Sequence, residues 1–389
     1  MLSPDGDRVL VIAHEASRTG AVIQLETVLT EWAKVGREFD VIVRRPGRLL
    51  EHLASLAPTT CLTPPHTRPA RRAVDKMRWS GPLDKALLAL PEARRLLARR
   101  HSAIFLNTAT HGDIADALPR LPTLTWVHEQ RRLLDHLCRP RDITRALAGS
   151  TRLAAVSESV RDDLDLLLGS VERDIPIVRP TIDPSPTPRP GLHRARLRES
   201  LGLPDGAVLV GACGALSWEK SPEMFLDVAR LAAAELSDDC CVAFAWLGEG
   251  AKPDVRARLI EEARRVGATQ VHFLGELSDP RPFFAALDLY LVTSTLDSFP
   301  VAALEAARDG SPIVCFAGAG GIKEFVATDA GVVLADRQAP LMAREVVRLA
   351  RATETRHLLG EAARQRVLKE YRPSLTADTL WRMATDRRG

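Results

Sequence analysis

The stretch that decides the fold is TSTLDSFPVAALEAARDGSPIVCFAGAGGIKE, residues 293–324. The mostly apolar run that leads into it, residues 287–293, has the length of a buried parallel strand. Pro300 stands where a helix can start, Gly310 stands where it can end, and a second apolar run follows at residues 312–316. The pattern is strand, loop, helix, strand, glycine turn and helix. It predicts an open α/β sheet, which binds ligands at the carboxyl ends of its strands.

Two carboxylates and a glycine turn predict that this stretch binds a nucleotide sugar. Asp297 lies in the first loop, and Glu305 lies in the apolar segment AALEAA, where a carboxylate is costly without a partner. The hydroxyl pair of a ribose is such a partner, because an ionised carboxylate accepts two hydrogen bonds. Backbone N–H groups of the turn at residues 317–321 can approach a pyrophosphate. The residues alone leave open a solvent-facing Glu305 and an ordinary loop.

This stretch resembles the signature of the family-4 glycosyltransferases, which are retaining enzymes of the GT-B fold. Their pattern has two acidic residues with seven residues between them, followed by a glycine pair and another glutamate. The positions that match it in register are Ser294, Asp297, Phe299, Pro300, Glu305, Ala306, Gly310, Pro312, Gly320, Gly321 and Glu324. Asp297 is the one departure, since the family usually has glutamate there. The charge is kept, and the reach of the side chain is one methylene shorter.

Length and composition point to an ordinary soluble protein of two domains. The chain has 389 residues, which exceeds the usual size of a single domain. A net charge of +3 gives no argument for nucleic-acid binding. No apolar run reaches the roughly 18 residues of a membrane helix, and the first strand begins too early for a signal peptide. The six cysteines show no metal spacing. These features predict a cytoplasmic protein, with peripheral contact to the inner membrane face left open.

The first half of the chain predicts a sheet of the same kind. A strand at residues 8–13, an amphipathic helix at 22–35 and a strand at 40–43 form a βαβ opening. The loop between the strand at 8–13 and the helix contains Arg18 and Gly20. It resembles the family's first loop, where the backbone approaches the phosphate or the acceptor. A plain tight turn is the alternative.

His128 follows a predicted strand at residues 123–127. The family has a histidine near the reacting carbon at this place, so the resemblance implies a contact with the donor sugar or the acceptor. The alternative is a strand-end histidine that bonds to a backbone carbonyl. A basic stretch at residues 67–100 suits either an anionic acceptor, a membrane surface that carries one, or a solvated helical face. Its leucine spacing favours the solvated face.

The second half predicts a diphosphate clamp. Lys220 precedes a helix start and matches the family pattern G-R-L-x-x-x-K-G, in which arginine and lysine clamp the diphosphate. Ala215 stands at the arginine position and Ser221 at the last glycine. Either the clamp is weaker without this arginine, or another residue, Arg18 or Lys323, supplies the missing cation. A surface lysine is the alternative for Lys220.

Two further segments complete the organisation. The loop at Gly275 resembles the place where the family's backbone binds the base, and a proline-rich run at residues 179–191 predicts a linker. Two DxD-like spacings, at residues 5–7 and 163–165, fall in a predicted turn and a predicted helix, so we expect no metal.

The sequence therefore predicts an α/β fold of GT-B architecture, with two Rossmann-like doubly wound parallel-sheet domains that face each other across a cleft. The first domain is expected at residues 1–180, joined by a crossing helix at 371–389. The linker is expected at 181–191 and the second domain at 192–370.

The resemblance implies retaining transfer of a sugar from a nucleotide diphosphate sugar to an acceptor, without metal or another cofactor. The implied catalytic residues are His128, Asp297 and Lys220. The implied donor-binding residues are Glu305, Gly320, Gly321, Ser298, Phe299, Gly275 and Glu324. Gly20 and Arg18 form the implied acceptor or phosphate loop. The acceptor class stays open among small molecules, lipid-linked compounds and glycans.

Other functions on this fold remain open from the sequence. One is a sugar-nucleotide epimerase or a phosphorylase. Another is a non-catalytic protein that binds a nucleotide sugar, which Ala215 and Asp297 would allow.

Overall fold

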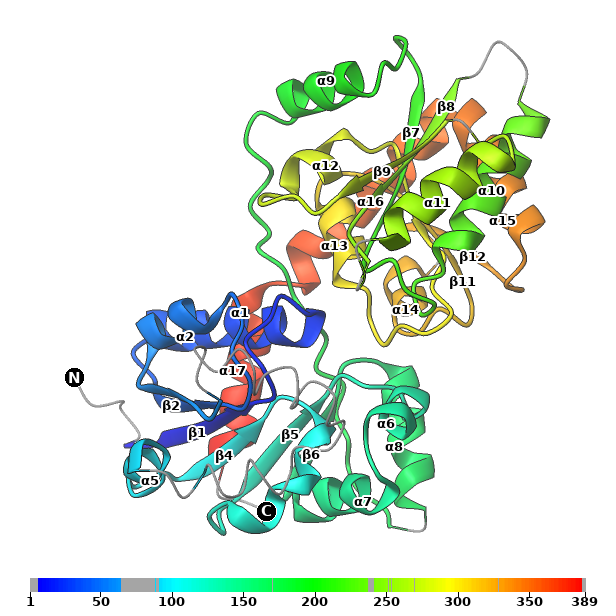
Figure 1. Ribbon diagram of the computed structural model, residues 1–389. Coiled ribbons are helices and arrows are strands. Elements are labelled where there is room, and N and C mark those ends of the chain that lie inside the picture. Colours follow the sequence, from blue (N-terminus) through cyan, green and yellow to red (C-terminus); the bar gives the residue numbers. More distant parts are fainter. Residues whose placement is uncertain are drawn as a thin grey trace. The chain divides into compact units, whose positions relative to one another are not determined.

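The structure is a computed structural model of the chain (Figure 1). It describes residues 6–63, 88, 91–169, 171–236, 241–250, 252, 254–268, 270–327 and 329–386. Most of the basic stretch at 67–100 and the first residue of the DxD-like turn at 5–7 lie outside the described residues. The chain divides into two compact units. Unit 1 is Met1–Thr181 with Pro373–Gly389, and unit 2 is Ile182–Arg372.

Unit 1 is built on a parallel sheet whose described strands run in the order β3-β2-β1-β4-β5-β6 (Figure 1). The strands are β1 (Arg8–Ala13), β2 (Glu38–Val43), β3 (Thr59–Cys61), β4 (Ala103–Leu106), β5 (Thr123–Val127) and β6 (Arg152–Ala155). The helices are α1 (Gly20–Lys34), α2 (Leu50–Leu56), α5 (Pro91–Leu97), η1 (Ala109–Asp113), η2 (Ala115–Ala117), α6 (Arg131–Leu137), α7 (Pro140–Gly149), α8 (Glu158–Leu168) and α17 (Pro373–Thr385).

Unit 2 repeats this topology. Its sheet runs β12-β11-β10-β7-β8-β9 within the described residues, which is the order of unit 1 when counted from β9. The strands are β7 (Val208–Cys213), β8 (Val242–Leu247), β9 (Val271–Gly275), β10 (Leu289–Val292), β11 (Ile313–Phe316) and β12 (Gly331–Leu334). The helices are α9 (Pro190–Ser200), α10 (Pro222–Glu235), α11 (Asp254–Arg265), α12 (Arg281–Ala286), α13 (Val301–Arg308), α14 (Ile322–Val326), α15 (Ala339–Arg351) and α16 (Thr353–Glu370).

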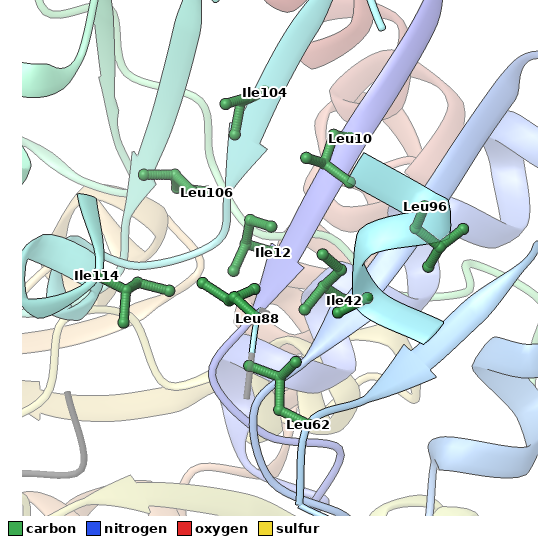
Figure 2. Packing of buried hydrophobic residues seen from close by; sticks show 10 residues of the cluster. Leu10, Ile12, Ile42, Leu62, Leu88, Leu96, Ile104, Leu106 and Ile114 are labelled. Carbon is green, nitrogen blue, oxygen red and sulfur yellow. The ribbon is translucent and has the colours of Figure 1, made fainter. Parts of the chain in front are cut away.

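Most residues of the central strands are apolar because parallel strands are covered on both faces. On one face of the unit 1 sheet, alternate residues of β1 (Leu10 and Ile12) and of β4 (Ile104 and Leu106) pack into one cluster (Figure 2). The other face is covered by α1 and α17. There the Trp32 indole N–H donates to the Ala377 carbonyl at 2.9 Å. Two doubly wound parallel sheets were predicted from the sequence, and the structure confirms them.

The boundaries of some elements differ from the prediction. Helix α1 begins at Gly20, two residues earlier than expected, so Gly20 is the first residue of the helix rather than part of the loop. The last residues of the proline-rich run begin α9, where Pro190 occupies the first turn. No described helix of the chain is both long enough and apolar enough to span a bilayer.

Candidate functional site

A pocket in unit 2 lies at the carboxyl ends of β7 and β10. These two strands are neighbours at the point where the strand order reverses, and doubly wound sheets bind ligands at such a point. Residues that line the pocket include Cys213, Lys220, Tyr290, Thr293, Ser294 and Asp297. The predicted lysine and one predicted carboxylate therefore lie in the same pocket.

Lys220 and Asp297 form an ion pair in this pocket. The Lys220 ammonium donates to Asp297 Oδ2, and the Asp297 side chain is only 8% exposed. The Ser294 hydroxyl donates to the same oxygen at 3.2 Å. Gly214 has a φ of 151°, and a Cβ at this position would lie 3.2 Å from Lys220 Cγ. Glycine at position 214 therefore leaves room for the lysine side chain.

The loops that carry this pair are joined by backbone hydrogen bonds. The N–H groups of Thr295 and Leu296 both donate to the Glu219 carbonyl, at 2.7 and 3.2 Å. The Thr293 hydroxyl donates to the Lys220 carbonyl at 2.9 Å. The loop after β7 and the loop after β10 are therefore held at a fixed spacing.

The predicted glycine turn packs directly on the acidic loop. Gly320 has a φ of 67°, and a Cβ there would lie 1.7 Å from the Asp297 carbonyl oxygen. The next N–H group, that of Gly321, donates to the Ser298 carbonyl at 2.9 Å. Only glycine fits position 320 for both reasons. Glu324 follows in the first turn of α14, where its N–H donates to the Gly321 carbonyl at 3.0 Å.

Glu305 lies on α13 and is half-buried. Burial and, after it, the negative charge of Glu305 raise the pKa of the Cys213 thiol to about 12. The same carboxylate contributes, after burial and other charges, to the raised pKa of Tyr290. Cys213 and Tyr290 line the pocket, so Glu305 acts electrostatically on the pocket that holds Lys220 and Asp297.

Two other predicted donor residues have roles within the fold of unit 2. Phe299 is 6% exposed, and its ring centroid lies 5.9 Å from that of Tyr371, so this side chain belongs to the core. Gly275 ends β9 with a φ of 73°, and its carbonyl accepts from the Gly248 N–H at 2.8 Å. A Cβ on Gly275 would lie 3.2 Å from the Arg256 guanidinium.

Unit 1 collects polar side chains at the carboxyl ends of β1, β4 and β5, which are neighbouring strands. Some of their buried atoms have no hydrogen-bond partner among the described residues. In unit 1 these unpaired atoms are His14 Nδ1, Asn107 Oδ1, His111 Nε2, His128 Nε2 and Gln130 Oε1. Buried polar atoms are rarely left unpaired in a folded protein, so this unit 1 polar cluster is suited to bind a ligand with several hydrogen-bonding groups.

His128 is neutral in this cluster at ordinary pH. Burial, together with the charge of His14, lowers the pKa of the His128 imidazole to about 3. The ring packs on Trp126, with the two centroids 4.3 Å apart. Next to it, the Glu129 carboxylate accepts a hydrogen bond from the Thr108 hydroxyl. It also accepts one from the backbone N–H of His128 at 3.3 Å. Burial raises the pKa of Glu129.

The predicted loop residues Arg18 and Gly20 are exposed. A Cβ on Gly20 would meet no atom within 4 Å, so the fold of unit 1 does not itself require glycine there. In the same loop the Glu15 carboxylate accepts from Ser17 and from Thr19, the latter at 3.3 Å. A hydrogen bond with His14 is the main reason why the pKa of Glu15 falls to about 2.

Sequence reasoning missed part of the unit 1 polar cluster. His14, Asn107 and His111 were not among the candidate residues, although His14 and Asn107 directly follow β1 and β4, and His111 lies in η1 shortly after β4. That position was the available signal. No group of three His, Cys, Asp or Glu side chains within the described ranges could hold a metal ion. Metal independence of the reaction stays a prediction.

Comparison with known proteins identifies the family of unit 2. Residues 193–366 match the family model of the glycosyl transferases group 1. The match covers less than half of the chain and lies within unit 2. The prediction of a glycosyltransferase, made from the acidic loop and the glycine turn, is therefore confirmed, and membership of family 4 stays a prediction.

Relatives and solved structures agree with this family. A D-inositol 3-phosphate glycosyltransferase of Salinispora arenicola is 30% identical over 57% of this chain and 52% of its own length. One of Corynebacterium urealyticum is 24% identical over 93% of this chain and 87% of its own length. In the first of these matches the chain spans about half the length of its relative.

The fold is shared with solved glycosyltransferase structures. The Anabaena protein Alr3699/HepE in complex with UDP-glucose has a TM-score of 0.76 at 18% identity, over 96% of this chain and 98% of that chain. Sucrose-phosphate synthase from Thermosynechococcus elongatus has a TM-score of 0.76 at 16% identity, over 97% and 98%. At these identities the likeness shows the fold, and the predicted GT-B architecture of two α/β domains is confirmed.

Gly320→Ala should destabilise the acidic loop. The added methyl group meets the Asp297 carbonyl at 1.7 Å in a left-handed backbone, so we expect a loss of roughly 2 kcal/mol or more in the free energy of unfolding. Gly318→Ala is the matched control, because a Cβ there meets no atom within 4 Å. Urea unfolding followed by circular dichroism measures the free energy of unfolding of both variants. Equal stabilities of the two variants would contradict this account of the turn.

His128→Gln should flatten the pH dependence of stability. The pKa of His128 is about 3 in the folded protein and near its usual value of 6.5 in the unfolded chain. Above pH 6.5 the His128 imidazole is neutral in both the folded and the unfolded protein. Below pH 6.5 the imidazole gains a proton only in the unfolded chain. The wild-type protein therefore loses up to about 1.4 kcal/mol per pH unit as the pH falls from 6.5 towards 3.

Urea unfolding at pH 7 and pH 4.5 tests this. The stability difference between wild type and His128→Gln should change by roughly 2–3 kcal/mol between the two pH values, to the disadvantage of the wild type at pH 4.5. An unchanged difference would mean that His128 is not held neutral.

Proposed function

We propose that the protein transfers a sugar from a nucleotide diphosphate sugar to an acceptor hydroxyl, with retention of anomeric configuration. The observation that carries this proposal is the pocket of unit 2. The ion pair of Lys220 and Asp297 lies there, at the strand ends of a group 1 glycosyl transferase domain, and the glycine turn packs on the loop that carries Asp297.

Each group in this pocket has a role in the proposal. Glu305 accepts hydrogen bonds from the ribose hydroxyls, and Asp297 accepts them from the sugar. Lys220 and the glycine turn at Gly320 and Gly321 bind the diphosphate, whose charge grows as the bond to the sugar breaks. The acceptor oxygen forms the new bond to the anomeric carbon, and its proton passes to the departing phosphate. Catalysis then rests on positioning and charge stabilisation.

The other predicted residues have further roles in the proposal. Gly275 lies where the base would meet the backbone, and Ser298 and Glu324 border the sugar and the glycine turn. Phe299 acts through its packing on Tyr371, which supports the acidic loop. We propose that His128, in its neutral form, hydrogen-bonds to the sugar near its anomeric carbon, and that Arg18 and Gly20 line the acceptor loop.

The donor and the acceptor are proposed by class. The Anabaena structures contain UDP and UDP-glucose, which makes uridine nucleotides the first donors to test. Several relatives are named for D-inositol 3-phosphate, and the unpaired atoms of the unit 1 polar cluster suit a hydroxyl-rich acceptor. Lipid-linked and glycan acceptors meet the same requirement. A cytoplasmic location, with contact to the inner membrane face, is part of the proposal.

Glu305→Ala should remove donor binding and leave the fold intact. UDP-, GDP-, ADP- and dTDP-glucose are tested by thermal shift, and the wild-type protein should be stabilised by at least one of them. The variant should lose that shift, because the ribose loses its carboxylate, while its own melting temperature stays nearly unchanged.

Glu261→Ala is the matched control for Glu305→Ala, since Glu261 is exposed on α11 and pairs with Arg264 three residues away. It should keep the full donor shift. The same shift in Glu305→Ala would remove Glu305 from the site.

Product analysis distinguishes the proposed transfer reaction from the alternative functions. A transferase releases the nucleotide diphosphate faster when polyol acceptors are added. An epimerase converts the donor without an acceptor, and a phosphorylase requires inorganic phosphate. Donor binding without turnover across the acceptor panel would identify a non-catalytic binding protein.

A further inference from the structure

Ser221 adopts a backbone conformation that normally belongs to glycine. It precedes α10 with a φ of 57°, in the left-handed region. The family pattern that Lys220 matches has glycine at this position. Here the serine hydroxyl has a partner, because it accepts a hydrogen bond from Arg337 Nη2 at 2.7 Å. Ser221 therefore combines a left-handed backbone with a side chain that is hydrogen-bonded to Arg337.

Arg337 also contacts the wall of the donor pocket. It lies in the loop between β12 and α15, and its Nη2 donates to the Thr293 carbonyl at 3.0 Å. Thr293 lines the pocket, and its hydroxyl donates to the Lys220 carbonyl at 2.9 Å. Two hydrogen bonds thus fix the guanidinium beside the residues that hold the lysine.

The charge of Arg337 is not neutralised by a carboxylate among the described residues. Its two acceptors, the Ser221 hydroxyl and the Thr293 carbonyl, are neutral. Lys220 differs, because Asp297 neutralises its ammonium. Partial burial lowers the pKa of Arg337, as expected for a cation without an acidic partner. The guanidinium is therefore a cation beside this pocket with charge left to bind an anion.

The family pattern has an arginine where Ala215 stands in this chain, so the site lacks one of the two cations of the diphosphate clamp. We propose that Arg337 supplies this second cation, with Ser221 as its anchor. This inference rests on the proposed function. It is an alternative to the sequence expectation that Arg18 or Lys323 supplies the cation. A planar guanidinium suits the role, because it can bind two anchors and a phosphate oxygen at once.

Arg337→Ala should weaken binding of UDP and spare binding of uridine, which lacks the phosphates. Isothermal titration with UDP should show a dissociation constant raised by about tenfold to a hundredfold, the effect of losing a charge-assisted hydrogen bond. Competition by uridine should change by less than about twofold. Arg337→Lys keeps the charge without the planar fork and should restore part of the UDP affinity.

Two further variants test the anchor and the specificity of the effect. Ser221→Gly relieves the left-handed strain, so its melting temperature should not fall, yet its UDP affinity should drop severalfold because Arg337 loses an anchor. Arg348→Ala is the matched control, since Arg348 is exposed on α15 and pairs with Glu345. It should bind UDP as the wild type does.

The possible results are distinguishable. Unchanged UDP binding by Arg337→Ala, or an equal loss for UDP and uridine, would overturn the role of Arg337 and leave the proposed function standing. If wild-type protein binds none of UDP, GDP, ADP and dTDP, both the proposed function and this inference fail. If a diphosphate other than UDP binds best, the same comparison is made with that diphosphate and its nucleoside.

Discussion

The ion pair between Lys220 and Asp297 is the interaction on which the pocket of unit 2 depends. Asp297 is almost fully buried, and a buried carboxylate is stable only with a partner of opposite charge and further hydrogen bonds. The pair joins the loop after β7 to the loop after β10. The backbone bonds to the Glu219 carbonyl and the close approach of Gly320 to Asp297 then fix the glycine turn against the same loop. A shift of any of these three segments would disturb the other two.

The two units use one topology for two different kinds of polar surface. In both, polar residues gather where the order of strands reverses. In unit 2 the pocket contains charged groups, which suits a charged diphosphate. In unit 1 the cluster contains buried imidazoles and amides with open hydrogen-bonding atoms, and His128 is held neutral. Neutral groups of this kind suit hydroxyls, because they can donate or accept without the desolvation cost of a buried charge.

Much of the fold and the centre of the donor site could be predicted because their signals are local in the sequence. Strand β10, the acidic loop, α13 and the glycine turn follow one another within about three dozen residues, and each carries its own signal in apolar runs, prolines and glycines. The role of Gly320 was predicted as a backbone approach to phosphate. The structure adds that the same glycine must accommodate the Asp297 carbonyl.

Contacts between distant residues could not be predicted in this way. Arg337 and Ser221 are 116 positions apart, and they can form a hydrogen bond because α10 and α15, the helices that follow them, pack together. The convergence of His14, His111 and His128 likewise depends on the order β1-β4-β5, which joins strands far apart in the chain. Phe299 matches the family pattern, but no local signal showed that its ring packs on Tyr371.

The most direct test of the central claim is a crystal structure of the protein soaked with UDP-glucose. The account predicts the diphosphate against Lys220 and the glycine turn at Gly320 and Gly321, with the ribose hydroxyls on Glu305. A nucleotide bound elsewhere, with the pocket between β7 and β10 empty, would contradict it.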